Sequence, residues 1–83
     1  MQARVRLFAV ARERAGRAEL TVELPDVATV ADLKRALGRD VPGLASILGG
    51  VRISVNHEYA VDTTPIPPGA ELAVIPPVSG GMD

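Results

Sequence analysis

The sequence contains no cysteine, which excludes disulfides, thiolate metal sites, iron–sulfur clusters and a cysteine nucleophile. It has only two aromatic residues, Phe8 and Tyr59, so its core must consist of valine, leucine, isoleucine and alanine. No uncharged run exceeds 11 residues, and one of that length, Val41 to Val51, includes a proline and three glycines and cannot span a bilayer. Charges at Arg12 and Glu13 interrupt the N-terminal apolar residues too soon for a signal peptide. These absences predict a cytoplasmic protein.

Groups that would carry chemistry are also scarce. The net charge of −1 predicts neither nucleic acid nor a membrane surface as a partner. His57 is the single histidine and has no second ligand near it, so we interpret it as a solvated turn residue. The sequence has no P-loop and no G-x-G-x-x-G, and its serines lack a nucleophile-elbow context. We therefore expect a domain with no active site of its own that binds no cofactor and no metal.

The 83 residues are 47% hydrophobic and 23% charged, which is typical of one folded domain rather than of a disordered chain. Alternation of apolar and polar residues predicts five strands, at residues 4–9, 18–24, 51–56, 59–61 and 71–75. We expect a turn or a single helical turn at 12–16, a short helical turn within the irregular segment 42–50, and a loop at 62–69 with its three prolines.

One helix is predicted between the second and third strands. Thr29 lies three residues before Asp32, which resembles a capping box with aspartate in place of glutamate. Gly38 is placed to end the helix. Its apolar stripe consists of Val30, Leu33, Ala36 and Leu37.

The predicted order of elements is β-β-α-β-β-β, an α+β arrangement. A hairpin, a right-handed crossover through the helix and a last strand parallel to the first give a mixed sheet packed on one helix. This is the β-grasp, or ubiquitin-like, fold. We expect a domain over residues 1–75 and an extended tail over residues 76–83.

The tail carries the most informative residues. Pro76 and Pro77 cannot donate ladder hydrogen bonds, so they end the sheet, and Val78 and Ser79 lead to Gly80-Gly81. Two glycines without Cβ atoms allow the backbone to enter the narrow channel of another protein. The six residues from Pro76 to Gly81 would reach about 20 Å when extended. A frayed terminus is the alternative interpretation.

A candidate docking surface follows from strand alternation. If Val5, Leu7 and Ala9 face the core, Phe8 points outward with Arg4 and Arg6. Ile75 should point outward at the root of the tail, and Tyr59 could join the two. An exposed aromatic residue beside aliphatic ones indicates partner binding. The alternative is a bulge in the first strand that buries Phe8.

Two segments resemble the MoaD/ThiS family of sulfur carriers. The first is Leu7-Phe8-Ala9-x-x-Arg12-Glu13-x-x-Gly16. The second is Val55-Asn56 followed by Gly69-x-Glu71-Leu72-Ala73-x-x-Pro76-Pro77-Val78-Ser79-Gly80-Gly81. Together they cover nearly the whole chain, and the pairing of the two motifs is far more specific than either alone.

The resemblance implies sulfur carriage in molybdenum cofactor biosynthesis. An E1-like adenylyltransferase, using ATP and magnesium, would adenylate the carboxylate of Gly81, beside Gly80, and a sulfurtransferase would supply the sulfur of the resulting thiocarboxylate. The large subunit of molybdopterin synthase, in a heterotetramer, would perform the catalysis on the pterin precursor. The resemblance places partner contacts at Phe8, Tyr59, Ile75, Pro76, Pro77 and Val78.

The chain departs from the family pattern because Met82 and Asp83 follow Gly81. Either a protease removes the two residues, or they are not native to the protein, or the chain carries no sulfur. Two other functions therefore stay open. One is sulfur carriage for the thiazole of thiamine, for another metabolite or for protein modification. The other is a ubiquitin-like interaction module that carries no sulfur.

Overall fold

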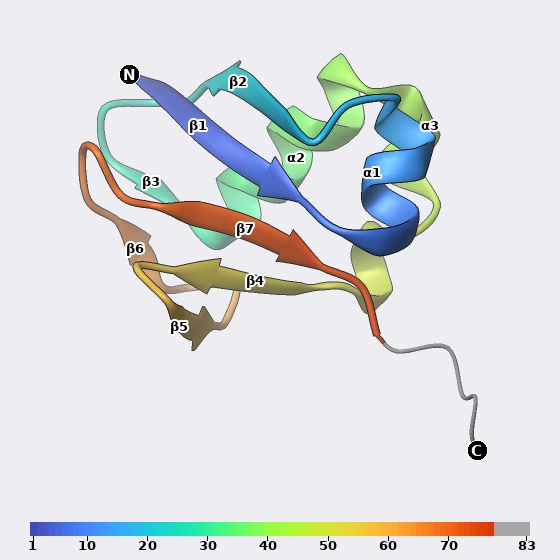
Figure 1. Cartoon of the computed structure of the whole chain (residues 1–83). Helices are drawn as coiled ribbons and strands as arrows, with labels where there is room; N and C mark the ends of the chain where they lie inside the picture. Colours follow the sequence, from blue (N-terminus) through green and yellow to red (C-terminus); the bar gives the residue numbers. More distant parts are fainter. Residues whose placement is uncertain (78–83) are drawn as a thin grey trace.

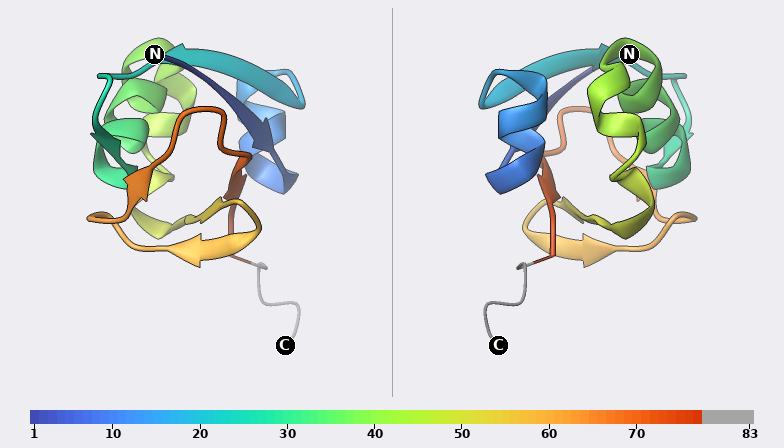
Figure 2. Two further views of the ribbon diagram at one scale, coloured as in Figure 1. Left: turned by 90° about the vertical axis from the view of Figure 1, so that its left-hand side faces the viewer. Right: turned by 90° about the vertical axis from the view of Figure 1, so that its right-hand side faces the viewer.

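The computed structural model describes residues 1–77, which form a curved five-stranded sheet and a helical layer (Figure 1). The strand order in the sheet is β2-β1-β7-β4-β5, and β3 and β6 form a separate two-stranded sheet. Figure 2 shows the large sheet curving around the core, with α2 on the open side. The elements are β1 (Gln2–Leu7), α1 (Ala9–Ala15), β2 (Glu19–Glu23), β3 (Ala28–Thr29), α2 (Val30–Asp40), α3 (Pro42–Ala45), the 3-10 helix η1 (Leu48–Gly50), β4 (Arg52–Val55), β5 (Glu58–Ala60), β6 (Pro65–Ile66) and β7 (Leu72–Ile75).

The first and last strands lie side by side at the centre of the sheet. β1 pairs antiparallel with β2 and parallel with β7, with Val5 opposite Leu72 and Leu7 opposite Val74. β7 pairs antiparallel with β4 on its other side. The β-grasp fold predicted from the sequence is therefore confirmed.

The core lies between the sheet and α2. Every second residue of β1 is buried, because alternate side chains of a strand point to opposite faces. Val5 and Val74 are fully buried from the sheet, as are Leu33 and Leu37 from α2. The predicted stripe of α2, completed by Val30 and Ala36, is buried throughout. A single aliphatic layer thus holds the helix on the sheet.

The capping box predicted at the start of α2 is confirmed. The backbone N–H of Thr29 donates to Asp32 Oδ2 at 2.9 Å, and the backbone N–H of Asp32 donates to Thr29 Oγ1 at 3.4 Å. The Thr29 N–H, and then the hydrogen bond from Arg35, hold the pKa of Asp32 below its ordinary value. The carboxylate also lies at the positive end of the helix dipole.

The prediction for the end of the first strand was wrong. β1 ends at Leu7, and Ala9 begins α1 with a φ of 51° and an exposed side chain, so it does not face the core. The predicted turn at 12–16 is the second half of this seven-residue helix, which ends at Gly16 with a φ of 74°. Ala11, fully buried, ties α1 to the core.

The prediction that α2 ends at Gly38 was also wrong. The helix continues to Asp40, and Pro42 at the start of α3 prevents its further extension. A Cβ at Gly38 would lie 3.5 Å from Leu48 and 3.7 Å from Ala45. Gly38 therefore lies where α2 packs against the following segment, which contains α3 and η1 rather than one short turn.

The sequence predicts a loop over residues 62–69, but this segment contains a short strand. Pro65 and Ile66 form β6, which pairs with β3 through Thr29 and Ala28. Ile66 is buried and closes one end of the core. The three prolines of this segment favour a loop, because proline is depleted in sheets. An edge strand of two residues nevertheless tolerates a proline. Within residues 1–77, no helix has the length and apolar character to cross a membrane.

Candidate functional site

Two rows of side chains cross the outer face of the sheet, opposite the core. In the first row, Arg6 of β1 lies beside Ala73 of β7, which lies beside Ser54 of β4, which pairs with Tyr59 of β5. In the second row, Ile75 of β7 pairs with Arg52 of β4. Phe8 joins this second row because its N–H donates to Val74 O at 3.3 Å, which continues the β1–β7 ladder by one residue. We call these seven residues the outer patch.

Phe8, Tyr59 and Ile75 are brought together as the sequence predicts. They line one depression of about 260 Å³. Phe8 is 41% exposed and Tyr59 64% exposed, while Ile75 is half-buried between them. The alternative in which a bulge buries Phe8 is excluded, because alternation in β1 holds through Leu7. The partner-binding role of these residues stays a prediction.

An arginine lies over each of the two aromatic rings. The guanidinium carbon of Arg6 is 5.7 Å from the centroid of Phe8, and that of Arg52 is 5.0 Å from the centroid of Tyr59. Such cation–π contacts are favourable even at exposed sites. The pattern is diagonal, since each row of the outer patch has an arginine at one end and an aromatic residue at the other.

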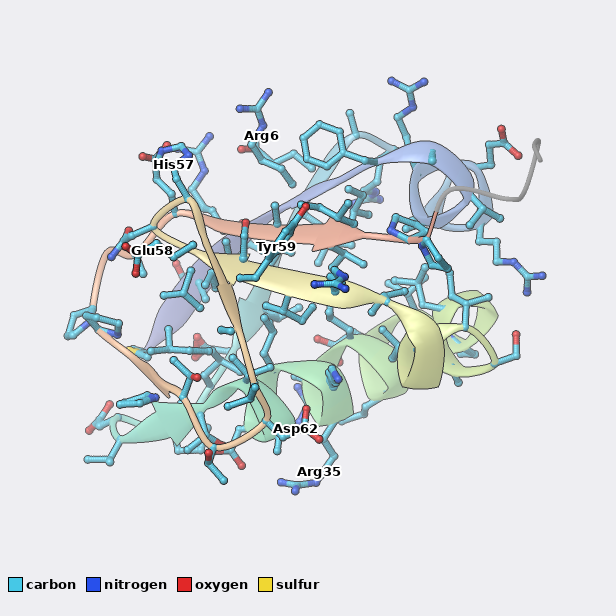
Figure 3. The ribbon with its side chains drawn as sticks, turned by 90° about the horizontal axis from the view of Figure 1, so that it is seen from below. Arg6, Arg35, His57, Glu58, Tyr59 and Asp62 are labelled. Carbon is cyan, nitrogen blue, oxygen red and sulfur yellow. The ribbon has the colours of Figure 1, made fainter. Side chains whose placement is uncertain are left out.

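A tight turn borders the outer patch beside Tyr59. Asn56 and His57 have φ values of 51° and 70°, as the two central residues of a type I′ hairpin turn require. His57 Nε2 lies 2.9 Å from Glu71 Oε1, and Asn56 Oδ1 accepts the N–H of Glu71 at 2.9 Å. His57 is thus an exposed turn residue, in the position that the sequence predicts. In Figure 3, Arg6 and His57 lie above Tyr59, which overlies the strands, whereas Arg35 and Asp62 lie at the bottom of the view, away from all three.

The root of the tail lies directly beside the outer patch. β7 ends at Ile75, as the two prolines require, and Pro76 is buried while Pro77 is exposed. Pro76 therefore packs against the fold and offers a partner less area than Pro77 does. The predicted sites Val78, Gly80 and Gly81 lie outside the described residues.

The sequence reasoning missed the contribution of Arg52 to the outer patch. Strand alternation was a sufficient signal for its direction, because Arg52 precedes the buried Ile53. Its contact with Tyr59 had no such signal, since it depends on the β4–β5 register. Among residues 1–77, no cluster of three or more histidine or acidic side chains could hold a metal ion.

Comparison with known proteins gives a consistent result. The model of the ThiS family matches residues 5–81. The molybdopterin synthase sulfur carrier subunit of Chlamydomonas reinhardtii is 40% identical over 83 residues, covering 98% of this chain and 100% of that protein. The protein of the same name from Arabidopsis thaliana is 36% identical, covering 98% of this chain and 84% of that protein.

Two solved structures resemble this fold. SAMP1 from Haloferax volcanii superposes with a TM-score of 0.86 at 31% identity, covering 98% of this chain and 100% of that one. A complex of subunits 1 and 2 of the molybdopterin-converting factor from Helicobacter pylori contains a chain that superposes with a TM-score of 0.67 at 26% identity. The match covers 98% of this chain and 100% of that one.

Proposed function

The chain belongs to the ThiS family, and on that premise we propose that it is the sulfur carrier subunit of molybdopterin synthase. The observation that carries the proposal is the near full-length similarity to sulfur carrier subunits of that synthase, at 36–40% identity. The match to the family extends through Gly80-Gly81, the residues that the chemistry needs. The cytoplasm is the proposed compartment.

The proposed reaction proceeds at the carboxylate of Gly81. A carboxylate oxygen attacks the α-phosphorus of ATP, held with magnesium by an E1-like adenylyltransferase, and pyrophosphate leaves. Sulfur at the oxidation level of sulfide, delivered by a sulfurtransferase, then attacks the acyl carbon and displaces AMP, which gives a thiocarboxylate. No side chain of the carrier takes part in these steps. ATP and magnesium belong to the activating partner.

The proposed partner in sulfur transfer is the large subunit of molybdopterin synthase. It would receive the tail in its active site, where the thiocarboxylate sulfur bonds to the pterin precursor. Water would then cleave the bond between the acyl carbon and sulfur, which returns the Gly81 carboxylate. The Helicobacter pylori complex of subunits 1 and 2 supports a heteromeric assembly of this kind. The outer patch is the proposed docking surface, because it exposes two aromatic rings next to the residue where the tail leaves the sheet.

Protein modification is a second candidate. The chain is similar to SAMP1 and to a chain in a second solved structure, which is named a small archaeal modifier protein. This similarity favours protein modification. Both functions begin with adenylation of the terminal glycine and separate afterwards. A modifier transfers its acyl group to an amine of a target protein and stays attached, whereas a sulfur carrier transfers sulfur and is released with a carboxylate.

The test concerns the bond between Gly81 and Met82. We expect a chain ending at Gly81 to support ATP–pyrophosphate exchange by the E1-like enzyme and the 83-residue chain not to, because activation needs a free carboxylate on Gly81. Equal exchange by both chains would contradict the removal of Met82 and Asp83. The trimmed, thiocarboxylated chain should then convert the pterin precursor when mixed with the large subunit. Isopeptide-linked products without conversion would favour the modifier.

A further inference from the structure

Arg6 and Arg52 differ from several other arginines of the chain in their partners. Arg4, Arg35 and Arg39 each pair with a carboxylate, at 3.1, 2.9 and 2.9 Å respectively. No carboxylate within residues 1–77 pairs with Arg6 or with Arg52, and each guanidinium instead lies over an aromatic ring. Two positive charges therefore lie on the outer patch without an ion pair to any carboxylate of residues 1–77.

The acidic residues at the border of the outer patch are already engaged. Glu19 lies opposite Arg6 in the β1–β2 ladder, but both of its carboxylate oxygens accept a hydrogen bond from Arg4 at 3.1 Å. Glu71 lines the same depression, but its carboxylate lies 2.9 Å from the His57 ring and its N–H is bonded to Asn56. The patch is thus locally cationic on a chain whose net charge is −1. Local charge of this kind steers association with a partner surface of opposite sign.

A partner that covers the aromatic rings must also cover the two guanidinium groups. Burying an ionised group without a partner is strongly unfavourable, so a purely apolar docking face would lose much of what it gains from Phe8 and Tyr59. A guanidinium that stacks on a ring still presents N–H donors at its edges, and carboxylates match this fork with two parallel hydrogen bonds. The chemistry that the patch selects is therefore an apolar surface flanked by carboxylates.

We propose that the docking face of the large synthase subunit carries carboxylate side chains opposite Arg6 and Arg52, and that these two arginines determine which large subunit this carrier accepts. This inference rests on the proposed function and deepens it. The aromatic rings supply apolar area, and the two charges, one in each row of the outer patch, fix the orientation of the partner. Each arginine is a specificity-determining residue that acts through contact with the partner and takes no part in sulfur transfer.

The experiment measures binding of the carrier to the large subunit from the same organism by calorimetry at two salt concentrations. Arg6→Glu and Arg52→Glu reverse the charge, whereas Arg6→Met and Arg52→Met keep the apolar stem and remove the charge. Arg35→Glu is the control, because it makes the same charge change on α2, away from Arg6 and Tyr59 (Figure 3). Circular dichroism establishes that each variant is folded before its affinity is compared.

We expect each reversal to weaken binding by about tenfold or more, and each methionine variant to weaken it by less. The affinity of the unaltered chain should fall as salt rises, and that of the Arg6→Met, Arg52→Met double variant should depend on salt much less. The Arg35→Glu control should bind as the unaltered chain does.

Methionine variants that bind as tightly as the unaltered chain, or more tightly, would overturn the inference and leave the proposed function intact. An unaltered chain that does not bind the large subunit at all would overturn the proposed function itself. Self-association of the unaltered chain that Arg6→Glu abolishes would assign the outer patch to a second copy, which also contradicts the inference.

Discussion

The two faces of the central sheet belong to the same strands but carry different kinds of side chain. Leu7 and Phe8 are neighbours in the sequence, yet Leu7 is 2% exposed in the core and Phe8 is 41% exposed on the outer patch. On β7, Val74 is fully buried while Ile75 is half-buried on the other face. The buried side chains of the inner face are all aliphatic, whereas the outer face carries both aromatic rings of the protein and an arginine over each ring. Side chains of the inner face therefore stabilise the fold, whereas those of the outer face are available to a partner.

The strongest way to break the inner face is Leu7→Ala. The side chain is fully enclosed between the sheet and the helices, so its truncation should leave a cavity and lower the free energy of unfolding by about 2–5 kcal/mol. Denaturant unfolding measures the change. Affinity for the large subunit, corrected for the folded fraction, should stay close to that of the unaltered chain. A loss of affinity equal to that of Phe8→Ala would contradict the separation of the two faces.

The matching change on the outer face is Phe8→Ala. We expect affinity for the large subunit to fall by about 1–3 kcal/mol, as for an aromatic anchor at an interface. The free energy of unfolding should change by less than about 1 kcal/mol, as for a surface position. Val27→Ala is a suitable control, because Val27 is 89% exposed and lies outside the outer patch. If Phe8→Ala unfolds the domain instead, the ring has a structural role and the docking surface lies elsewhere.

These two positions also show how far the sequence alone could lead. Alternation in β1 and β7, the capping box and the proline pair after Ile75 are local patterns, and they were sufficient for the β-grasp fold and for the direction of Phe8. Local patterns could not show that the chain turns into α1 at Ala9, since the apolar alternation continues through that residue.

Features that depend on tertiary contacts were likewise hidden. The length of α2 beyond Gly38 is decided by packing against Leu48 and Ala45, and β6 exists because Ile66 is buried beside β3. At the candidate site, the sequence grouped Phe8, Tyr59 and Ile75. It could not predict that Arg52 lies over Tyr59, because that contact depends on a cross-strand register.

A smaller effect is expected at the start of α2, which covers the inner face. Thr29→Ala removes the Oγ1 acceptor of the Asp32 N–H and should lower the free energy of unfolding by about 1 kcal/mol. Thr63→Ala, in an exposed turn, is the control. Thermal and denaturant unfolding of both variants measure the difference. Equal stability of the two would mean that water replaces the cap without loss.

The capping box also predicts a dependence on pH. The pKa of Asp32 is lowered in the folded protein, mainly by the Thr29 N–H and then by Arg35, so the folded state binds this proton less readily than the unfolded chain does. The resulting stabilisation is complete above the ordinary pKa of 3.8 and is lost as the pH falls below it. Asp32→Asn should therefore flatten the decline of stability in acid. An unchanged acid profile would contradict the role of this carboxylate.

The smallest expected effect is a gain in stability from Gly38→Ala. Gly38 lies inside α2 in helical conformation, where glycine is less favourable than alanine by about 0.5–1 kcal/mol. The nearest atoms to an added Cβ are 3.5 Å and 3.7 Å away, on Leu48 and Ala45, which is ordinary van der Waals contact. The new methyl group should therefore fit without displacing α3 or η1, and denaturant unfolding should show a gain of about 0.5 kcal/mol or more.

Gly16→Ala is the matched opposite of this change. No atom lies within 4 Å of an added Cβ at Gly16, but its φ of 74° disfavours any side chain, so alanine should destabilise there by about 1 kcal/mol. The two substitutions therefore test different reasons for a glycine. Gly38→Ala tests the space around the Cβ, and Gly16→Ala tests backbone strain. Because Gly38 lies in the helical layer that covers the core, Gly38→Ala should leave affinity for the large subunit unchanged. Destabilisation by Gly38→Ala would mean that the contact between α2 and Leu48 has no room for a methyl group.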